Sequence, residues 1–297
     1  MAIQTHRADL SVSQDLSVAD DLSVGTRYDV DEIRAGLLTD GIIACKGAFT
    51  PEWADAMRED VMAEFAVAIA REGGAIGRGP QRWYVEMHPE AFRGFLDLVT
   101  HPWVELVSEA MLGPDYRIVE IGFDIPFAGA KHQPWHRDFR TTPEMVNNHT
   151  FSSLAFNLTC VDTIDEMGPF EIAPGTQYED GETFNHGMFP PESEFARYAS
   201  LGVKKYPKRG DMSARSALTI HRGTANLSAD LSRPVLVLGV DSPGAGHEEL
   251  HDLQVTQSFW DTVPEKTKPH LACRVVEQLE PIVQKHDIEG LVMGAEE

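Results

Sequence analysis

The chain has 297 residues, of which 42% are hydrophobic and 24% charged, so it can bury the core of a globular protein. Its 47 Asp and Glu outnumber its 25 Lys and Arg, and the net charge of −22 makes nucleic acid and anionic membranes poor partners because both would repel it. The 3 cysteines are far apart and form no Cys-x-x-Cys pair, which argues against a zinc site or a disulfide framework.

The N-terminal segment holds three similar hexads, "DLSVSQ", "DLSVAD" and "DLSVGT". Three hexads are too few to bury a β-solenoid core, so we expect residues 1–27 to be a disordered or flexible leader without a catalytic role. Residues 28–297 are expected to form a single domain. No secretory signal and no apolar run of about 20 residues is present, which predicts a cytoplasmic protein.

Helices are predicted first along the chain. Asp29 or Asp31 would cap a short helix, Gly41 ends it, and "IIACKG" is predicted to be a buried strand. Thr50 and Pro51 mark the start of the clearest helix, which runs to the glycines at 73 and 74. A further helix is predicted for "HPWVELVSEAML", residues 101–112.

From about residue 117 the sequence becomes rich in β-forming residues. Short runs separated by Gly- and Pro-rich turns predict strands in a sandwich or barrel. The runs are "YRIVEIGFDI", "SSLAFNLTCV", "GPFEIAP", "SALTIH" and "PVLVLGV". We therefore expect a β core at about 117–242 and a C-terminal extension at 243–297, with a last helix in "EPIVQKHDIEG".

The segment "HQPWHRDF", residues 132–139, is the first candidate site. In an extended segment, residues i and i+2 project to the same side, so His136 and Asp138 would both reach one metal ion about 2 Å away. A His-x-Asp pair is weak evidence by itself, and a metal site would need a third ligand from elsewhere in the chain.

His221 is the third candidate ligand because it closes the apolar run "SALTIH" in front of a turn that contains glycine. Two histidines and one carboxylate leave half of an octahedral coordination sphere open, as in non-haem Fe(II) oxygenases. Arg233 begins the run that contains "PVLVLGV", and a buried guanidinium there would need an anion such as a carboxylate. Surface or structural roles are expected for the histidines His88, His101, His149, His186, His247 and His251.

Taken together, "HRD", "MGPFEIAPGTQ" and "HRGTANLSADLSRP" resemble the phytanoyl-CoA dioxygenase family of Fe(II)- and 2-oxoglutarate-dependent oxygenases. That family has a His-x-Asp, a Gly-Pro strand leading to Pro-Gly-Ser/Thr, and a distal turn with His, Gly, Asn, Ser and then Arg. The similarity extends from "DGIIACKGAFT" to about residue 241. It implies a mainly β fold with flanking helices: a double-stranded β-helix, or cupin-like jelly-roll barrel, with N-terminal helices packed outside.

The resemblance also implies roles for individual residues. His136, Asp138 and His221 would be the iron ligands at the catalytic centre. Arg233 would bind the distal carboxylate of 2-oxoglutarate, with Thr224 as a hydroxyl partner. Gln133 and Asn157 would also contact the cosubstrate.

The distal turn departs from the family pattern. It has His-Arg-Gly-Thr where members often have His-Gly-Ser, so Arg233 falls one place later and Thr224 is displaced from the position of the family's serine. Arg222 is therefore a rival anion contact. Gln177 stands where the family often has a histidine, a change that we interpret as neutral for catalysis.

Four aromatic residues are candidates for substrate binding. Trp135 and Phe139 flank the ligands and would line the pocket, although aromatic residues beside a buried site are often part of the core. Trp83 and Tyr84 follow the glycine-rich "GRGP" and would belong to a lid, with a plain surface loop as the alternative.

The implied reaction is oxidation of a C–H bond of a small molecule by Fe(II), 2-oxoglutarate and O2, with release of succinate and CO2 and with ascorbate as an accessory reductant. Because related halogenases have a small residue in its place, Asp138 favours hydroxylation or a related oxidation; desaturation, ring closure and epimerisation stay open. One alternative is a jelly-roll metalloenzyme that does not use 2-oxoglutarate, such as a cupin-like isomerase or dioxygenase. A non-catalytic metabolite-binding module is the other.

Nothing in the sequence indicates recognition of acyl-CoA, and Arg71, Arg78 and Arg82 are too scattered for a phosphoadenosine site. We expect the substrate to be a small metabolite or an intermediate of natural-product biosynthesis. No nucleic-acid or membrane partner is expected, and periodicity does not determine the oligomeric state.

Overall fold

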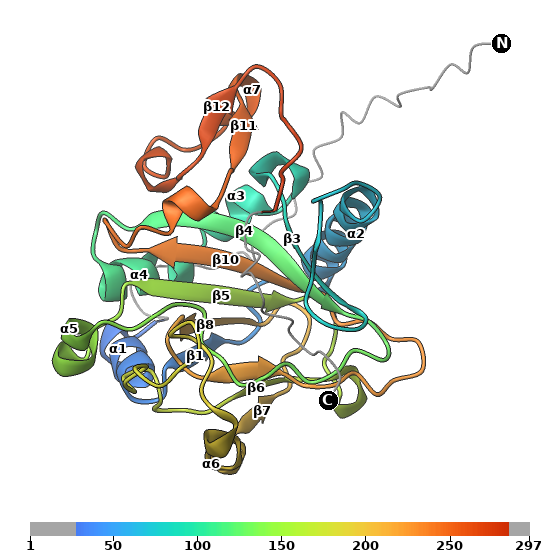
Figure 1. Ribbon diagram of the computed structural model, residues 1–297. Helices are drawn as coiled ribbons and strands as arrows, with labels where there is room; N and C mark the ends of the chain where they lie inside the picture. Colours follow the sequence, from blue (N-terminus) through green and yellow to red (C-terminus); the bar gives the residue numbers. More distant parts are fainter. Residues whose placement is uncertain (1–27, 285–297) are drawn as a thin grey trace.

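Two antiparallel sheets form the centre of the computed structural model, which describes residues 28–284 (Figure 1). In spatial order the larger sheet contains β1 (Ile42–Cys45), β8 (Met212–Ser216), β5 (Ser153–Thr159), β10 (Val235–Asp241), β4 (Arg117–Pro126), β3 (Arg82–Glu86) and β2 (Ile76–Gly77). The smaller sheet contains β7 (Val203–Lys205), β6 (Phe170–Ile172) and β9 (His221–Gly223). This arrangement confirms the predicted jelly-roll class, although no ladder of the described residues joins the two sheets into a closed barrel.

Alternating residues give the central strands two different faces. On β10, Leu236 and Leu238 are buried in the hydrophobic core, whereas Val235 and Val237 line a cavity. On β5, Phe156 packs edge-on against Trp103 of α4 (Pro102–Leu112), with 5.8 Å between ring centroids. Because successive side chains of a strand point to opposite faces, the apolar set of each strand meets the helices and the other set faces the interior of the jelly roll.

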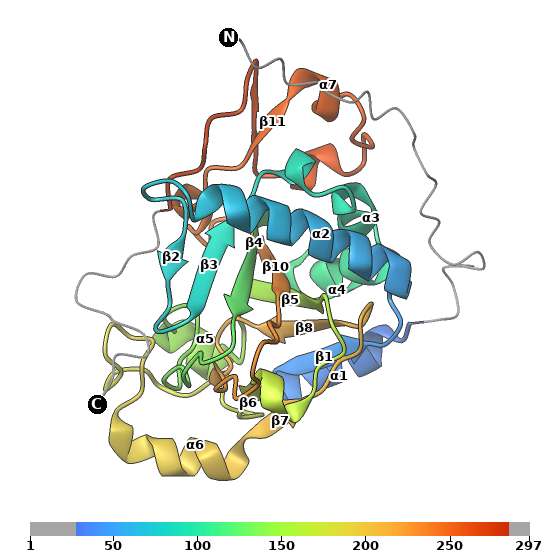
Figure 2. The ribbon, with the colours of Figure 1, turned by 90° about the vertical axis from the view of Figure 1, so that its right-hand side faces the viewer.

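The N-terminal helices cover the outer face of the larger sheet. Figure 2 shows α2 (Pro51–Ala68) lying across β3 and β4. The predicted caps are present: Asp29 accepts hydrogen bonds from the first turn of α1 (Val30–Thr39), and Thr50 accepts one from Trp53 N. The remaining helices are α3 (Phe95–Val99), α5 (Pro143–Asn148), α6 (Phe195–Leu201) and α7 (Gln257–Trp260), with 3-10 turns at Pro89–Ala91, Asp165–Met167, Glu192–Glu194, Glu248–Leu250 and Lys268–His270.

The prediction of a strand for "SALTIH" is wrong. Residues 217–220 form a turn and a bend that lead from β8 in the larger sheet to β9 in the smaller sheet. His221 therefore begins a strand instead of ending one. Apolar residues in a buried crossover between sheets resemble a buried strand, and periodicity does not separate the two.

Residues 75–90 include the segment predicted to be a lid or a plain surface loop, and they are not a plain loop. They contain β2 and β3, which pair as a hairpin at one edge of the larger sheet, and β3 pairs in turn with β4. The aromatic and β-branched side chains of "RWYVE" favour a strand, although a glycine-rich stretch precedes them. Strand pairing therefore fixes Trp83 and Tyr84 in the sheet.

The C-terminal extension lies above the larger sheet in the view of Figure 1. Here β11 (Gln254–Thr256) and β12 (Arg274–Val276) form a small parallel sheet beside α7. The predicted last helix is absent at residues 280–284, and its remainder lies outside the described residues, as does the predicted leader at 1–27. Within residues 28–284, no helix has the length and apolar character needed to cross a membrane.

Candidate metal centre and its two cavities

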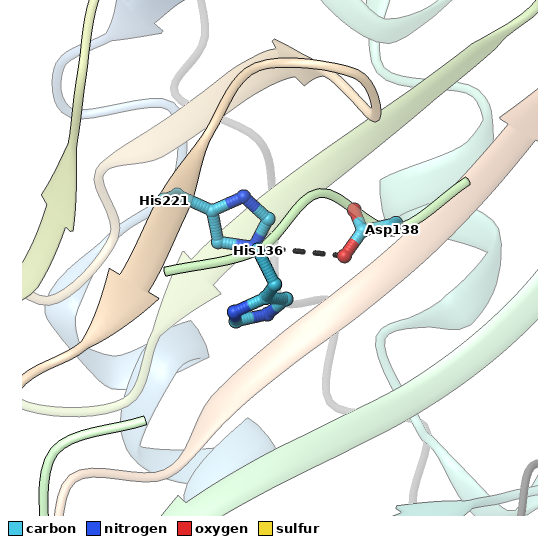
Figure 3. Close-up of side chains that lie close together, drawn as sticks. All are labelled: His136, Asp138 and His221. Carbon is cyan, nitrogen blue, oxygen red and sulfur yellow. Dashed lines mark ion pairs between the residues drawn. The ribbon is translucent and has the colours of Figure 1, made fainter. Parts of the chain in front are cut away.

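The three predicted ligands come together in the structure. The backbone of His136, in the segment after β4, pairs with the backbone of His221 on β9, with N–O distances of 2.9 and 2.8 Å. This pairing brings the two imidazole rings to 4.4 Å between centroids, and Asp138 lies beside them (Figure 3). Potential ligand atoms of the three side chains all lie within 4.8 Å of one another. The geometry is therefore that of two nitrogen donors and one oxygen donor around a single point.

Hydrogen bonds orient both imidazoles. His136 Nδ1 lies 2.8 Å from the carbonyl oxygen of Pro134, and His221 Nδ1 lies 2.9 Å from that of Thr219. A carbonyl only accepts, so each Nδ1 carries the hydrogen and each Nε2 is left with its lone pair. The Nε2 of His221 faces Asp138 Oδ1 at 3.5 Å. Such outer contacts select the tautomer that metal binding requires.

Burial controls the protonation of the three side chains. It lowers the pKa of His136 to about 4, and burial with the charges of Arg215 and His136 lowers the pKa of His221 well below its ordinary value. Burial alone would raise the pKa of Asp138, but the charges of Arg215 and the two histidines outweigh it and hold that pKa below its usual range. At neutral pH the site therefore offers two neutral imidazoles and a carboxylate, the forms that bind a metal ion.

Arg215 belongs to the candidate site, and sequence reasoning missed it. Its Nη1 donates to Asp138 Oδ2 at 2.5 Å from the inner face of β8. The signal available was an arginine inside the β-forming run "MSARS", which must find an anion when the strand is buried. Nothing local indicated that the anion is a candidate metal ligand.

A first cavity of about 460 Å³ borders the triad and extends into the jelly roll. Arg233 lines it and is buried, and its Nε donates to the carbonyl of Gly168 at 2.9 Å. Burial and the nearby charge of Arg82 lower the pKa of Arg233 to about 10, which still leaves it a cation at neutral pH. A fixed, buried guanidinium across a cavity from a metal site is suited to bind the far carboxylate of a small diacid.

Two further predicted cosubstrate residues lie in this cavity. Gln133 lines it and accepts a hydrogen bond from Gly223 N at 2.9 Å, next to His221. Asn157 lines it from β5.

The other two anion or cosubstrate candidates are not among the residues that line the cavity. Thr224 donates its hydroxyl to Pro169 O at 2.6 Å. Arg222 pairs with Glu171 at 2.7 Å, so its role as a rival anion contact is not supported. The Gln177 amide donates to Leu38 O at 2.9 Å, at the end of α1, which is a structural contact.

A second cavity of about 440 Å³ is lined by two residues of the same triad, His136 and Asp138. Of the four aromatic residues predicted to bind substrate, Phe139 and Tyr84 line it. Its apolar wall also includes Ile76, Leu154, Met188, Phe189 and Leu250.

Trp135 and Trp83 do not line this cavity. The Trp135 ring is fully buried in a separate small core with Tyr198, Phe184 and Ile220. Trp83 points to the outer face of β3, where its ring contacts Phe65 of α2 and Phe127. Successive side chains of an extended segment point to opposite sides, which explains both results. Tyr84, next to Trp83, and His136, next to Trp135, take the inward positions.

The histidines predicted to be surface or structural stay outside the triad; among the described residues, His136, Asp138 and His221 are the one cluster suited to a metal ion. His101 caps α4, and His88 lies 2.7 Å from Glu280 O. His251 pairs with Glu86 at 2.8 Å on the wall of the second cavity, a buried ion pair that the sequence did not reveal.

Comparison with known proteins gives one family. The family model "Phytanoyl-CoA dioxygenase (PhyH)" matches residues 37–235. No curated protein sequence gave a significant match.

Among solved structures, the chain is similar to the epimerase SnoN in complex with Fe3+, alpha ketoglutarate and nogalamycin RO, with a TM-score of 0.55, 16% identity, and 89% of this chain and 97% of that chain covered. It is similar to EctD from S. alaskensis with 2-oxoglutarate and 5-hydroxyectoine (TM-score 0.58, 15% identity, 77% and 81% covered). It is also similar to AviO1 from Streptomyces viridochromogenes Tue57 (TM-score 0.53, 16% identity, 74% and 97% covered). At these identities the likeness establishes a shared fold.

Proposed function

Because this chain belongs to the phytanoyl-CoA dioxygenase family, we propose that it is an Fe(II)- and 2-oxoglutarate-dependent dioxygenase acting on a small molecule. The balanced reaction joins substrate, 2-oxoglutarate and O2 and yields oxidised substrate, succinate and CO2. In a hydroxylation, one oxygen atom of O2 enters succinate and the other enters the product.

The observation that carries this proposal is the position of the triad between two cavities. Two neutral imidazoles and one carboxylate on one side of a metal ion leave the other coordination positions free, which suits non-haem Fe(II). The same donors lie at the border of the cavity that contains the buried Arg233. Metal and 2-oxoglutarate together would supply the oxidising chemistry.

The chain's own residues would position the reactants. Arg233 would hold the distal carboxylate of 2-oxoglutarate in the first cavity, and Gln133 stabilises the adjoining backbone at Gly223. Phe139 and Phe189 would exclude water from the substrate side. The two cavities would thus keep cosubstrate and substrate on different sides of the metal.

A small-molecule substrate fits the second cavity. Its volume of about 440 Å³ lies within the usual range for sites of small ligands. SnoN and EctD were crystallised with nogalamycin RO and 5-hydroxyectoine, which are small molecules. The proposal therefore extends to a metabolite or natural-product intermediate as the substrate.

The test is a screen of candidate substrates with anaerobically loaded Fe(II) and 2-oxoglutarate, in which succinate is measured after O2 is admitted. The expected result is succinate release that requires substrate and Fe(II) and that is lost in His136→Ala. Equal release by His136→Ala and wild type would show that the triad does not carry the reaction. Substrate conversion without 2-oxoglutarate would instead indicate a different kind of jelly-roll metalloenzyme.

A further inference from the structure

Arg78 lies between the two cavities and lines both of them, as do Asp124, His136, Asp138, Arg215 and Val237. It follows β2 at the tip of the hairpin and is half-buried. We propose that Arg78 binds a carboxylate group of the substrate and so restricts the enzyme to small carboxylic acids with an apolar body. This inference rests on the proposed function.

Arg78 differs from the other arginines around the site because its guanidinium has no hydrogen-bond acceptor among the described residues and instead lies over an aromatic ring. Arg82 donates to Thr224 O, Arg137 to Gly187 O, Arg215 to Asp138, and Arg233 to Gly168 O. Each of those four has at least one fixed partner. The donors of Arg78 are available to a ligand.

Tyr84 provides a platform for Arg78. The guanidinium carbon lies 4.2 Å from the centroid of the Tyr84 ring, a cation–π arrangement. The Tyr84 hydroxyl donates to the carboxylate of Glu120, and Gly122 leaves room for the ring, because a Cβ there would collide with it. The ring is therefore fixed, and it holds the arginine without using the donors that a bidentate carboxylate needs.

The rest of the second cavity defines what such a substrate looks like. Its wall is apolar around Phe139, Met188 and Phe189, which suits a carbon skeleton. Glu120 and Asp241 also line the cavity and would repel an anion near them. A carboxylate entering the cavity is thus attracted to Arg78 and repelled by Glu120 and Asp241. The apolar wall beside the metal site, where the Phe189 ring lies 5.8 Å from that of His136, is left for the carbon chain.

The cosubstrate is also a carboxylate, but its two acidic groups have other positions. One would lie at Arg233 in the first cavity and the other at the metal itself. The third anion site at Arg78 is then left for the substrate. The two sources of a carboxylate can be separated by measuring the affinities for 2-oxoglutarate and for a second acid independently.

The experiment uses the anaerobic full-length protein loaded with Fe(II) and 2-oxoglutarate, whose visible charge-transfer band reports an intact centre. Matched pairs of an acid and its primary amide are titrated, starting with hexanoate and hexanamide and with 3-phenylpropionate and 3-phenylpropanamide. Binding is followed by the change in this band and by calorimetry. We expect wild type to prefer at least one acid over its amide by about 10- to 100-fold, the usual effect of a charge-assisted contact.

Arg78→Gln should lose that preference while its Kd for 2-oxoglutarate stays within about threefold, and Arg78→Lys should keep part of the preference. Arg71→Gln is the matched control, because Arg71 comes from the same segment but lines neither cavity, and it should behave as wild type. The proposal is overturned if no acid in the panel binds better than its amide, or if Arg78→Gln keeps the preference. It is also overturned if Arg78→Gln weakens 2-oxoglutarate instead. Failure of the proposed function would appear separately, as absence of the band in wild type.

Discussion

Arg215 and Asp138 form an ion pair across the interior of the jelly roll, with 2.5 Å between Nη1 and Oδ2. The carboxylate that faces the two histidines is therefore also held by a cation on β8. Its second oxygen, Oδ1, lies 3.5 Å from His221 Nε2. One oxygen of Asp138 is thus used for orientation while the other remains available to a metal.

Replacing Arg215 should weaken metal binding. Arg215→Met is expected to lower the affinity for Fe(II) by about 10- to 100-fold, the usual cost of removing a group that orients a ligand. The measurement is anaerobic titration with Fe(II) or with Co(II) as a spectroscopic substitute. A higher affinity in Arg215→Met would mean that repulsion between the guanidinium and the metal outweighs the orientation of Asp138.

Substitutions of Arg233 and of Arg222 should differ in their effect on the affinity for 2-oxoglutarate. Arg233→Met is expected to raise the Kd for 2-oxoglutarate by about 100-fold, because a buried charge-assisted pair is lost. Arg222→Met should change it less than about threefold, since Arg222 pairs with Glu171 and does not line the cavity. Calorimetric titration of the Fe(II)-loaded protein measures both. A larger loss in Arg222→Met would reverse our assignment of the anion site.

The pair of His251 and Glu86 should make stability depend on pH. Burial alone would lower the pKa of His251, but its hydrogen bond to Glu86 and the charges of Glu120 and Glu86 raise it. A raised pKa means that the folded protein binds the proton more tightly than the unfolded chain. The pair therefore contributes its full stabilisation of the fold below about pH 6.5, which is the pKa of His251 in the unfolded chain. This stabilisation is lost as the pH rises through the pKa of His251 in the folded protein.

The expected result is that the stability advantage of wild type over His251→Gln is greater at about pH 6 than at about pH 9. Urea denaturation at both pH values measures the free energy of unfolding. His149→Asn serves as a control, because His149 is exposed and Asn tolerates its positive φ of 51°. An advantage that grows as pH rises would contradict the raised pKa of His251.

Trp135 should contribute to stability and not to substrate affinity. Its ring is fully buried with Tyr198 and Phe184, so Trp135→Ala is expected to lower the free energy of unfolding by about 3–5 kcal/mol. Phe139→Leu, by contrast, changes the wall of the second cavity and should alter the KM of a substrate found in the screen. Denaturation curves and steady-state kinetics of both variants test this. Unchanged stability in Trp135→Ala would contradict the packing described.

Local sequence was sufficient for the features that depend on near neighbours. Asp29 and Thr50 were recognisable as caps because the groups they satisfy lie within three residues of them. The runs of β-forming residues also predicted the central strands β4, β5 and β10, because strand propensity is a local property of the sequence. The family pattern added the triad and Arg233, because spacing and residue type mark chemistry even where the intervening fold is unknown.

Tertiary structure alone decided the features whose partners are distant in the chain. The turn at 217–220 sends β8 and β9 to different sheets, and an apolar local pattern does not record that change. Trp135 adjoins a ligand in sequence, which predicts a place in the pocket. Because neighbouring side chains of an extended segment point to opposite sides, its ring instead lies in a separate small core. Arg215 and Arg78 acquire their meaning from Asp138 and from the two cavities, which exist only after the sheets have come together. Long-range pairing determines which face and which partner a side chain receives, and local propensity contains neither.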